Sequence, residues 1–286
     1  MIQLNDIKKA YHTEYDTLQV LKGINLTVER GEMVSIMGAS GSGKSTLMNI
    51  IGLLDTYDSG TYYFDGQDMS LLDSVERSAY RSKNIGFVFQ AANLIAYKNV
   101  VENVALPLFY QHVSKKEREA RAMEKLEPLG IASWAKHYPN ELSGGQKRRV
   151  AIAGVLAMKP EFLILDEPSA GLDPKARDEI LGTIASLKEK TGISIILVSH
   201  SMEDVAKYVD RLIVMNKSEI VYDDTPKAVF RNYKELEKIG LRAPQITYLV
   251  HRLKQEGIDI DTDITKLSEA KEALIRLIDK KRDINK

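Results

Sequence analysis

The sequence predicts an α/β fold in which a mainly parallel sheet is covered by helices. Apolar runs alternate with segments of helical periodicity, and this strand–helix–strand rhythm is typical of parallel sheets. Helix-forming residues dominate between residues 103 and 142 and again after residue 225. We therefore expect an α/β core that carries a helical insert between two β/α halves and a helical tail.

The individual elements follow from periodicity and from turn residues. The first 37 residues are β-rich, and the predicted strand at residues 60–66 closes with an Asp-Gly turn. The predicted strands span residues 2–4, 24–28, 31–37, 60–66, 85–90, 162–165, 193–199, 211–215 and 219–222. Predicted helices span residues 45–54, 115–127, 142–158, 176–188 and 267–278, and two more begin at Thr225 and at Ala243. Residues 223–243 are the predicted linker.

The composition limits the classes of protein that the chain represents. Its 286 residues are 44% hydrophobic and 28% charged, as in soluble globular proteins of one large or two modest domains. Forty basic and forty acidic residues cancel, which argues against nucleic acid as a partner. There is no cysteine, and the N-terminus lacks the pattern of a signal peptide. Because no apolar run approaches the roughly 18 residues of a membrane helix, we expect any work at a membrane to need a partner.

The stretch GASGSGKST at residues 38–46 predicts a phosphate-binding loop. It fills the pattern Gly-x4-Gly-Lys-Ser/Thr between a predicted strand and a predicted helix, which is the required context. Backbone N–H groups of such a loop wrap an anion, and the helix start adds a positive dipole. We expect Lys44 to reach the terminal phosphates and the Ser45 hydroxyl to ligate Mg²⁺. The candidate nucleotide-binding residues of this loop are Gly38, Ser40, Gly41, Gly43, Lys44, Ser45 and Thr46.

Two adjacent carboxylates, Asp166 and Glu167, directly follow the apolar run at residues 162–165. At the carboxyl edge of a sheet and beside a phosphate loop, the first carboxylate is suited to hold Mg²⁺ and the second to polarise the attacking water. Glu167 is therefore the candidate general base. A solvated Asp-Glu turn is the alternative.

Gln90 and His200 each end a predicted strand. The amide of Gln90 is suited to ligate the metal and to sense the γ-phosphate, and the imidazole of His200 to stabilise the transition state. Taken alone, a strand-terminal glutamine is more often a surface residue and a lone histidine after a strand is more often structural. Both assignments depend on the motifs around them.

Those motifs make the resemblance definite. The chain carries, in order, the phosphate loop, Gln90, the pentapeptide LSGGQ at residues 142–146, the Asp166-Glu167 strand, SAGLD at residues 169–173, and His200. In this order it resembles the ATP-binding cassette (ABC) ATPases over roughly residues 1–225. The resemblance implies a P-loop NTPase fold with a mixed, mainly parallel sheet, an N-terminal antiparallel β subdomain and a helical subdomain.

By that resemblance the bound molecules are ATP and Mg²⁺, and the nucleotide lies between two subunits. Ser143, Gly144, Gly145 and Gln146 would face the γ-phosphate of ATP bound to a second copy or a paralogue, in a head-to-tail dimer. Tyr11 matches the aromatic platform for adenine, although it is also readable as an ordinary strand tyrosine, and Asp173 resembles the loop aspartate that links the two sites. The cluster at residues 147–149 is interpreted as a solvated helix face and not as a nucleic-acid patch.

The resemblance also implies a division of the chain and a location. A nucleotide-binding domain would span residues 1–225, with its helical subdomain at about 91–155, and a helical extension would span 226–286. Family members power integral-membrane transporter subunits, so this chain is expected at the cytoplasmic face of the membrane, held there by those subunits.

Two branches of the family are represented in one chain. Residues 1 to about 135 resemble the ATPases of lipoprotein-release, macrolide-efflux and bacitracin-resistance systems. Residues from about 140 to 286 resemble the ATPases of energy-coupling-factor importers. This mixture favours a fused sequence with a seam near residues 134–142 over a genuine intermediate.

Three function classes compete for the motifs. A transporter ATPase is favoured. A soluble cassette ATPase of DNA repair would place a long coiled coil between the phosphate loop and LSGGQ, and one of translation would join two cassettes in one chain. A phosphate-loop kinase or a nucleotide switch would not need LSGGQ.

Overall fold

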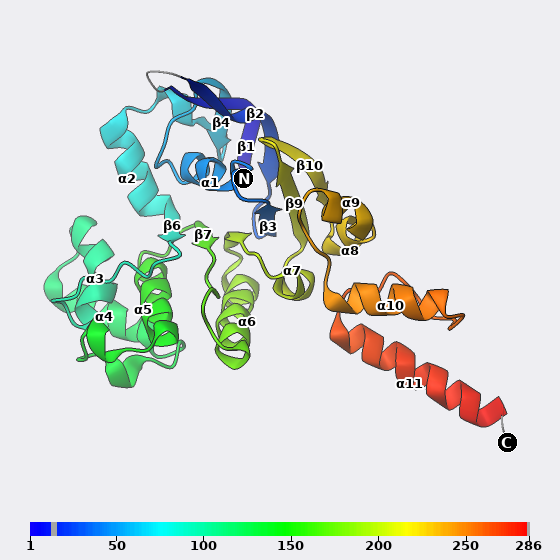
Figure 1. The fold of residues 1–286 in the computed structure, drawn as a ribbon. Helices are drawn as coiled ribbons and strands as arrows, with labels where there is room; N and C mark the ends of the chain where they lie inside the picture. The colour runs from blue at the N-terminus through cyan, green and yellow to red at the C-terminus, as the bar shows by residue number, and fades with distance from the viewer. Residues whose placement is uncertain (13–15, 285–286) are drawn as a thin grey trace.

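The computed structural model describes the backbone of residues 1–12 and 16–284 and the side chains up to residue 279. It is an α/β molecule in which the N-terminal strands lie at the top of the view and the helices lie below and to the sides (Figure 1). The strands are β1 (Ile2–His12), β2 (Thr17–Val28), β3 (Met33–Gly38), β4 (Ser59–Phe64), β5 (Gln67–Asp68), β6 (Ile85–Val88), β7 (Phe162–Asp166), β8 (Ser194–Val198), β9 (Arg211–Asn216) and β10 (Glu219–Asp224). The predicted fold class is confirmed.

The helices are distributed between the core, an insert and the tail. Three short 3-10 helices are η1 (Met69–Leu71), η2 (Ala132–Trp134) and η3 (Pro139–Glu141). The α-helices are α1 (Lys44–Ile51), α2 (Ser74–Asn84), α3 (Val100–Tyr110), α4 (Lys115–Leu126), α5 (Gly144–Ala157), α6 (Pro174–Thr191), α7 (Met202–Tyr208), α8 (Pro226–Phe230), α9 (Tyr233–Lys238), α10 (Gln245–Gln255) and α11 (Leu267–Ile284). None of the helices in the described part of the chain is long and apolar enough to span a bilayer.

The larger sheet has six strands in the order β10-β9-β3-β8-β7-β6. Strands β9, β3, β8, β7 and β6 run parallel, and only β10 is antiparallel to its neighbour. Every residue of β3 and of β8 is buried, as a parallel sheet covered on both faces requires. Because these strands are parallel, the ends of β3, β6, β7 and β8 meet at one edge of the sheet.

A second, antiparallel sheet is formed by the N-terminal strands in the order β2-β1-β4-β5. Its apolar side chains share one cluster with α1 and with one face of the larger sheet, so the two sheets pack together. The β4–β5 connection is the predicted Asp-Gly turn, with Asp65 at φ 48° and Gly66 at φ 80°. The N-terminal antiparallel β part implied by the resemblance is confirmed.

The helical insert consists of α3, α4 and α5, which lie together at one side of the molecule (Figure 1). The sequence analysis missed α2, although its start carries a clear signal. Asp73 accepts hydrogen bonds from the backbone of Val75 and Glu76, while Glu76 bonds back to Asp73, which is a capping box.

The predicted linker at residues 223–243 is wrong. Helices α8 and α9 fall inside it, and their residues Val229, Phe230 and Leu236 are at most 1% exposed within the main apolar cluster. Their polar neighbours conceal this burial in the sequence, because only a few apolar side chains on two short helices contact the core.

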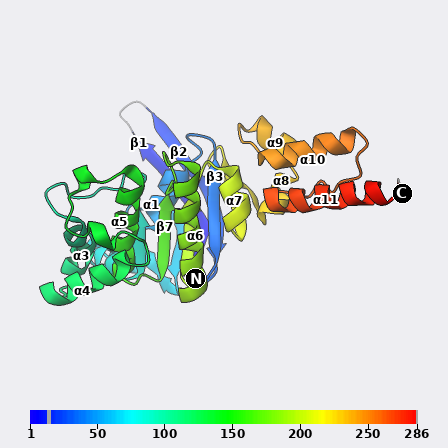
Figure 2. The same cartoon turned by 90° about the horizontal axis from the view of Figure 1, so that it is seen from below.

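The last two helices, α10 and α11, form a small apolar cluster of their own and extend away from the sheets on the side opposite the insert (Figure 2). One link to the core is a hydrogen bond from the backbone N–H of Gln245 to Glu203 Oε1 at 3.2 Å. Since Pro244 offers no side-chain cap to α10, Glu203 supplies it from α7. The predicted division at residue 225 stays a prediction.

Phe230→Ala tests whether α8 belongs to the core. Removing this buried ring should lower the free energy of unfolding by about 3–5 kcal/mol, measured by urea denaturation of the purified chain. Leu71 is 81% exposed, so the control Leu71→Ala should change the free energy of unfolding by less than about 0.5 kcal/mol. Equal effects of the two substitutions would show that residues 226–238 are not part of the core.

Candidate functional site

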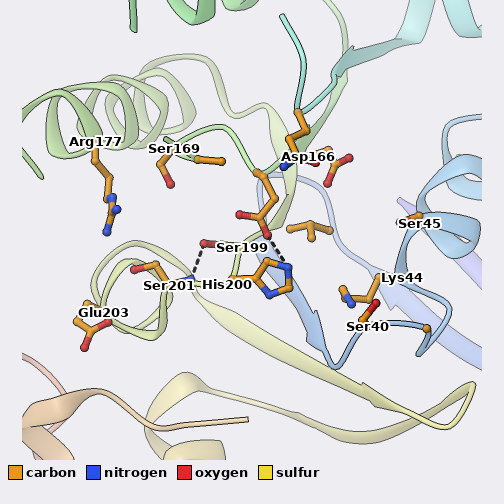
Figure 3. A pocket seen from close by; sticks show the side chains of 15 residues that line it. Ser40, Lys44, Ser45, Asp166, Ser169, Arg177, Ser199, His200, Ser201 and Glu203 are labelled. Carbon is orange, nitrogen blue, oxygen red and sulfur yellow. Dashed lines mark hydrogen bonds and ion pairs between the residues drawn. The ribbon is translucent and has the colours of Figure 1, made fainter. Parts of the chain in front are cut away.

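A cavity of about 650 Å³ lies at the edge of the larger sheet where β3, β7 and β8 end (Figure 3). It brings together residues from the loop before α1 and the start of that helix, from the ends of β7 and β8 and the segments that follow them, from the segment after β6, and from the starts of α6 and α7. The predicted site residues that line it are Ser40, Gly41, Lys44, Ser45, Gln90, Asp166, Glu167 and His200.

The loop at residues 38–43 has a backbone that only glycine fits at two points. A Cβ on Gly38 would lie 2.4 Å from the carbonyl oxygen of Met215, and one on Gly43 would lie 2.6 Å from that of Val20. Gly43 also has φ 97°, in the left-handed region. The loop is therefore pressed against β2 and β9 on one side, which leaves its other side to the cavity.

Lys44 is held inside this loop. Its ammonium donates hydrogen bonds to the carbonyl oxygens of Gly38 at 2.8 Å and Ala39 at 2.9 Å, and the residue is 9% exposed. Burial lowers the pKa of Lys44, and the negative charges of Glu167 and Asp166 act in the opposite direction. A buried cation therefore lies at the loop and within the field of two carboxylates.

Glu167 occupies a constrained position after β7. Its φ is 49°, and its backbone N–H donates to the carbonyl oxygen of Val198 at 3.0 Å. The side chain is 11% exposed, and Oε1 lies 3.3 Å from Nε2 of His200, whose own side chain is 66% exposed. Burial raises the pKa of Glu167, and His200 acts to lower it. A buried carboxylate therefore lies beside a solvent-accessible imidazole.

The oxygen donors at this edge fit a magnesium ion. Asp166 offers a carboxylate, Ser45 a hydroxyl and Gln90 an amide oxygen, and these are the donor types that Mg²⁺ takes. Burial raises the pKa of Asp166, and Arg148 is the first of the cations that lower it. Among the residues that the structure describes, no group of three His, Cys, Asp or Glu could hold a metal ion. The single carboxylate suits Mg²⁺, which completes its shell with water and phosphate oxygens.

The strands that lead to Gln90 and His200 end earlier than predicted. Strand β6 ends at Val88 and β8 ends at Val198, so each candidate lies two residues beyond its strand. The last pair of the β6–β7 ladder is Val88 with Leu165, and β6 is the edge strand of the sheet. The carbonyl oxygens of Phe89 and Gln90 are instead held by Arg148 Nη1, at 2.9 and 2.6 Å.

The segment at residues 143–146 begins α5 and does not line the cavity. The Ser143 hydroxyl accepts a hydrogen bond from Gln146 N at 3.3 Å, and the Gln146 side chain accepts one from Ser143 N at 2.8 Å. An added Cβ on Gly144 would meet no atom within 4 Å. Packing within this chain therefore does not explain the glycine, whereas close approach of another molecule would.

Tyr11 and Asp173 have structural partners in the chain. The Tyr11 hydroxyl donates to Asp55 Oδ2 at 2.7 Å, and this bond raises the pKa of Tyr11. The ring is 41% exposed, which leaves part of it open for stacking. Asp173 caps α6 by accepting hydrogen bonds from the N–H groups of Lys175 and Ala176, both at 3.0 Å.

Several residues of the site were missed by the sequence analysis. Arg177, Ser169, Ser199 and Glu203 line the cavity (Figure 3). Arg177 follows the cap Asp173 by one helical turn, and this spacing could have indicated that Arg177 lies near the site. The interpretation of residues 147–149 as a solvated helix face is wrong for Arg148, which is 6% exposed.

The chain matches two family models and several known proteins. A family model described as "ABC transporter" matches residues 21–170, and one described as "AAA domain, putative AbiEii toxin, Type IV TA system" matches residues 135–206. The "Energy-coupling factor transporter ATP-binding protein EcfA2" of Clostridium perfringens is 43% identical over 261 residues, which cover 90% of this chain and 91% of that protein.

A relative with a shorter match and a solved structure complete the comparison. The "Uncharacterized ABC transporter ATP-binding protein YknY" of Bacillus subtilis is 46% identical over 221 residues, or 77% of this chain and 95% of that protein. The structure is described as "Dimeric structure of a post-hydrolysis state of the ATP-binding cassette MJ0796 bound to ADP and Pi". It has a TM-score of 0.74 and 38% identity, and it covers 79% of this chain and 99% of that one. The EcfA2 match is to a protein named for energy-coupling factor transport. The resemblance of the first 135 residues to the other branch and the seam near residues 134–142 stay predictions.

The titration of Glu167 tests the electrostatics of the cavity. Its carboxyl should titrate above the ordinary range of glutamate, about 4.3, because burial disfavours the ionised form. His200→Gln should raise that pKa further, since a protonated His200 stabilises the carboxylate. NMR titration of ¹³C-labelled glutamate side chains measures both, and His112→Gln is the control. A lower pKa in the His200→Gln chain would contradict the pairing.

Proposed function

Because this chain belongs to the ATP-binding cassette transporter family, in which it is an ATP-hydrolysing subunit, we propose that two ATP molecules bind between two such chains, head to tail. The second chain is another copy or a paralogue. The observation that carries the proposal is that two glycine-rich helix starts, both candidate anion half-sites, lie apart in one chain. The phosphate loop lies in the cavity, and the glycine start of α5 lies outside it.

The first half-site supplies the contacts to the phosphates. The Lys44 ammonium donates two hydrogen bonds to the loop carbonyl oxygens. Its third N–H would donate to a phosphate oxygen. The backbone of Ser40 to Gly43 and the start of α1 offer N–H groups, and Thr46 lies in the first turn of that helix. Tyr11 would stack on the base, for which its exposed ring is suited.

The second half-site is the start of α5. Ser143, Gly144 and Gly145 would meet the γ-phosphate held by the other chain, with the helix dipole favouring the negative charge. Gln146 keeps the helix start in shape through its bond to Ser143. Asp173, at the start of α6, would link the two sites across the interface.

We propose that Mg²⁺ is held by Ser45, Gln90 and Asp166 together with the nucleotide. When bound, the ion would neutralise phosphate charge and polarise the phosphoryl group. The residues of the chain do the rest. Glu167 accepts a proton from the attacking water, His200 donates a hydrogen bond to the γ-phosphate, and Lys44 balances the charge that accumulates there.

Transport would require membrane subunits. We propose a position at the cytoplasmic face of the membrane through such subunits, and a role of the energy-coupling-factor type. The support is the EcfA2 match, which covers 90% of the chain and therefore includes part of the tail after residue 225. The YknY match covers a smaller share of this chain, 77%.

Glu167→Gln should leave ATP binding intact and reduce hydrolysis by about 10²–10⁴-fold, because the general base is lost while the shape is kept. A chain that cannot hydrolyse ATP should then accumulate as a dimer. Light scattering on a size-exclusion column, with and without ATP and Mg²⁺, measures this. A monomer at saturating ATP would contradict the shared site.

Gly144→Ala should block the ATP-dependent dimer without destabilising the chain. The added methyl group meets nothing within the chain but would occupy the space where the phosphate approaches. We expect the dimer to weaken at least about tenfold, or ~1.4 kcal/mol, in the Glu167→Gln background. Gly182→Ala is the matched control, since this helical glycine of α6 also has no atom within 4 Å of an added Cβ. Equal dimerisation of both variants would contradict the role of α5.

A further inference from the structure

Arg148 is a buried cation that the proposed reaction does not use. It lies on α5, and its Nη1 atom donates hydrogen bonds to the carbonyl oxygens of Phe89 and Gln90 at 2.9 and 2.6 Å. Burying a guanidinium is costly unless its donors are satisfied. Among the residues that the structure describes, no carboxylate lies within ion-pair distance of Arg148. The two carbonyl oxygens are its hydrogen-bond partners.

These two carbonyls begin a segment that is fastened at both ends to the helical insert. At the far end, Asn103 Nδ2 of α3 donates to the carbonyl oxygens of Lys98 at 2.8 Å and Asn99 at 3.0 Å, and its Oδ1 accepts from Ile95 N at 2.7 Å. Helices α3 and α5 pack in the same apolar cluster. The segment from Phe89 to Asn99 is therefore bound to the insert at both ends.

The same helix carries the second half-site. Ser143 caps α5 and Arg148 follows it by five positions, a separation of about 7.5 Å along the axis at 1.5 Å per residue. A regular helix is one of the rigid elements through which two sites can be coupled, so a displacement of the α5 start would also move Arg148.

We propose that Arg148 is a positioning residue that couples the start of α5 to Gln90. Contact of residues 143–145 with the nucleotide of the other chain would fix the position of α5. Arg148 would then hold the Gln90 backbone so that the Gln90 side chain reaches the metal in the cavity of the same chain. The two nucleotide sites of a dimer would thereby sense each other. This inference rests on the proposed function.

Arg148→Met tests the coupling, because methionine resembles the unbranched aliphatic part of arginine but cannot donate the two hydrogen bonds. The readout is the affinity for ATP measured by calorimetry, once in EDTA and once with Mg²⁺. We expect the affinity in EDTA to be unchanged and the gain on adding Mg²⁺ to fall about tenfold, as for other residues that orient metal ligands. Lys147→Met, which removes the neighbouring cation of the same helix, is the control and should behave as the wild-type chain.

Arg148→Lys covers the case in which Arg148→Met fails to fold. Its ammonium reaches less far than the guanidinium, so the gain on adding Mg²⁺ should still be reduced, although less than in Arg148→Met. Hydrogen exchange of residues 89–99 gives a second readout. ATP with Mg²⁺ should protect this segment in the wild-type chain and protect it less in the Arg148 variants.

A folded Arg148 variant with the wild-type gain on adding Mg²⁺ and the wild-type protection would overturn the inference while leaving the proposed function intact. A wild-type chain that neither binds nor hydrolyses ATP would instead overturn the proposed function. A loss of thermal stability with no change in either readout would reduce Arg148 to a structural residue.

Discussion

The charges gathered at one edge of the parallel sheet are the constraint on which the site depends. Lys44 is buried at the start of α1, Asp166 is half-buried at the end of β7, and Glu167, which follows it, is buried. The carboxylates favour the charged form of the lysine, while burial disfavours the charge on every member of the group. The register of β3, β8 and β7 places these groups together, because parallel strands end at a common edge. The cavity is polar although the strands beneath it are apolar, because these side chains converge at the edge where the strands end.

Helix α5 connects the two half-sites within one chain. Its start is open to solvent at Gly144, its middle holds the Phe89 and Gln90 carbonyls through Arg148, and its apolar side chains pack in the main core. The cavity contains the groups that would bind the nucleotide and activate water. The start of α5 would contact a nucleotide held in the cavity of the second chain. In the proposed dimer, a second chain would complete each site, and α5 would connect the two sites mechanically.

The sequence predicted what depends on local pattern. The strand ahead of the glycine loop, the strand ahead of Asp166 and the helix that begins near residue 142 are encoded in consecutive residues, and the structure has each of these elements close to where it was expected. Burial that depends on tertiary contacts was not predictable. Arg148 lies in a charged cluster of the sequence, yet it is buried and bonded to the carbonyl oxygens of Phe89 and Gln90, which are distant in the sequence. Phe230 was placed in a linker for a similar reason, since a five-residue helix shows no periodicity from which packing could be inferred.

The central claim is that one nucleotide is held by the phosphate loop of one chain and the α5 start of another. The chain has no cysteine, so single cysteines can be introduced without background. Ser40→Cys and Ser143→Cys chains would be mixed, oxidised with and without ATP, and examined by electrophoresis. The account predicts a cross-linked dimer in the mixture with ATP, and none in either variant alone. A mixture that yields no cross-link at saturating ATP, or an equal yield without ATP, would contradict it.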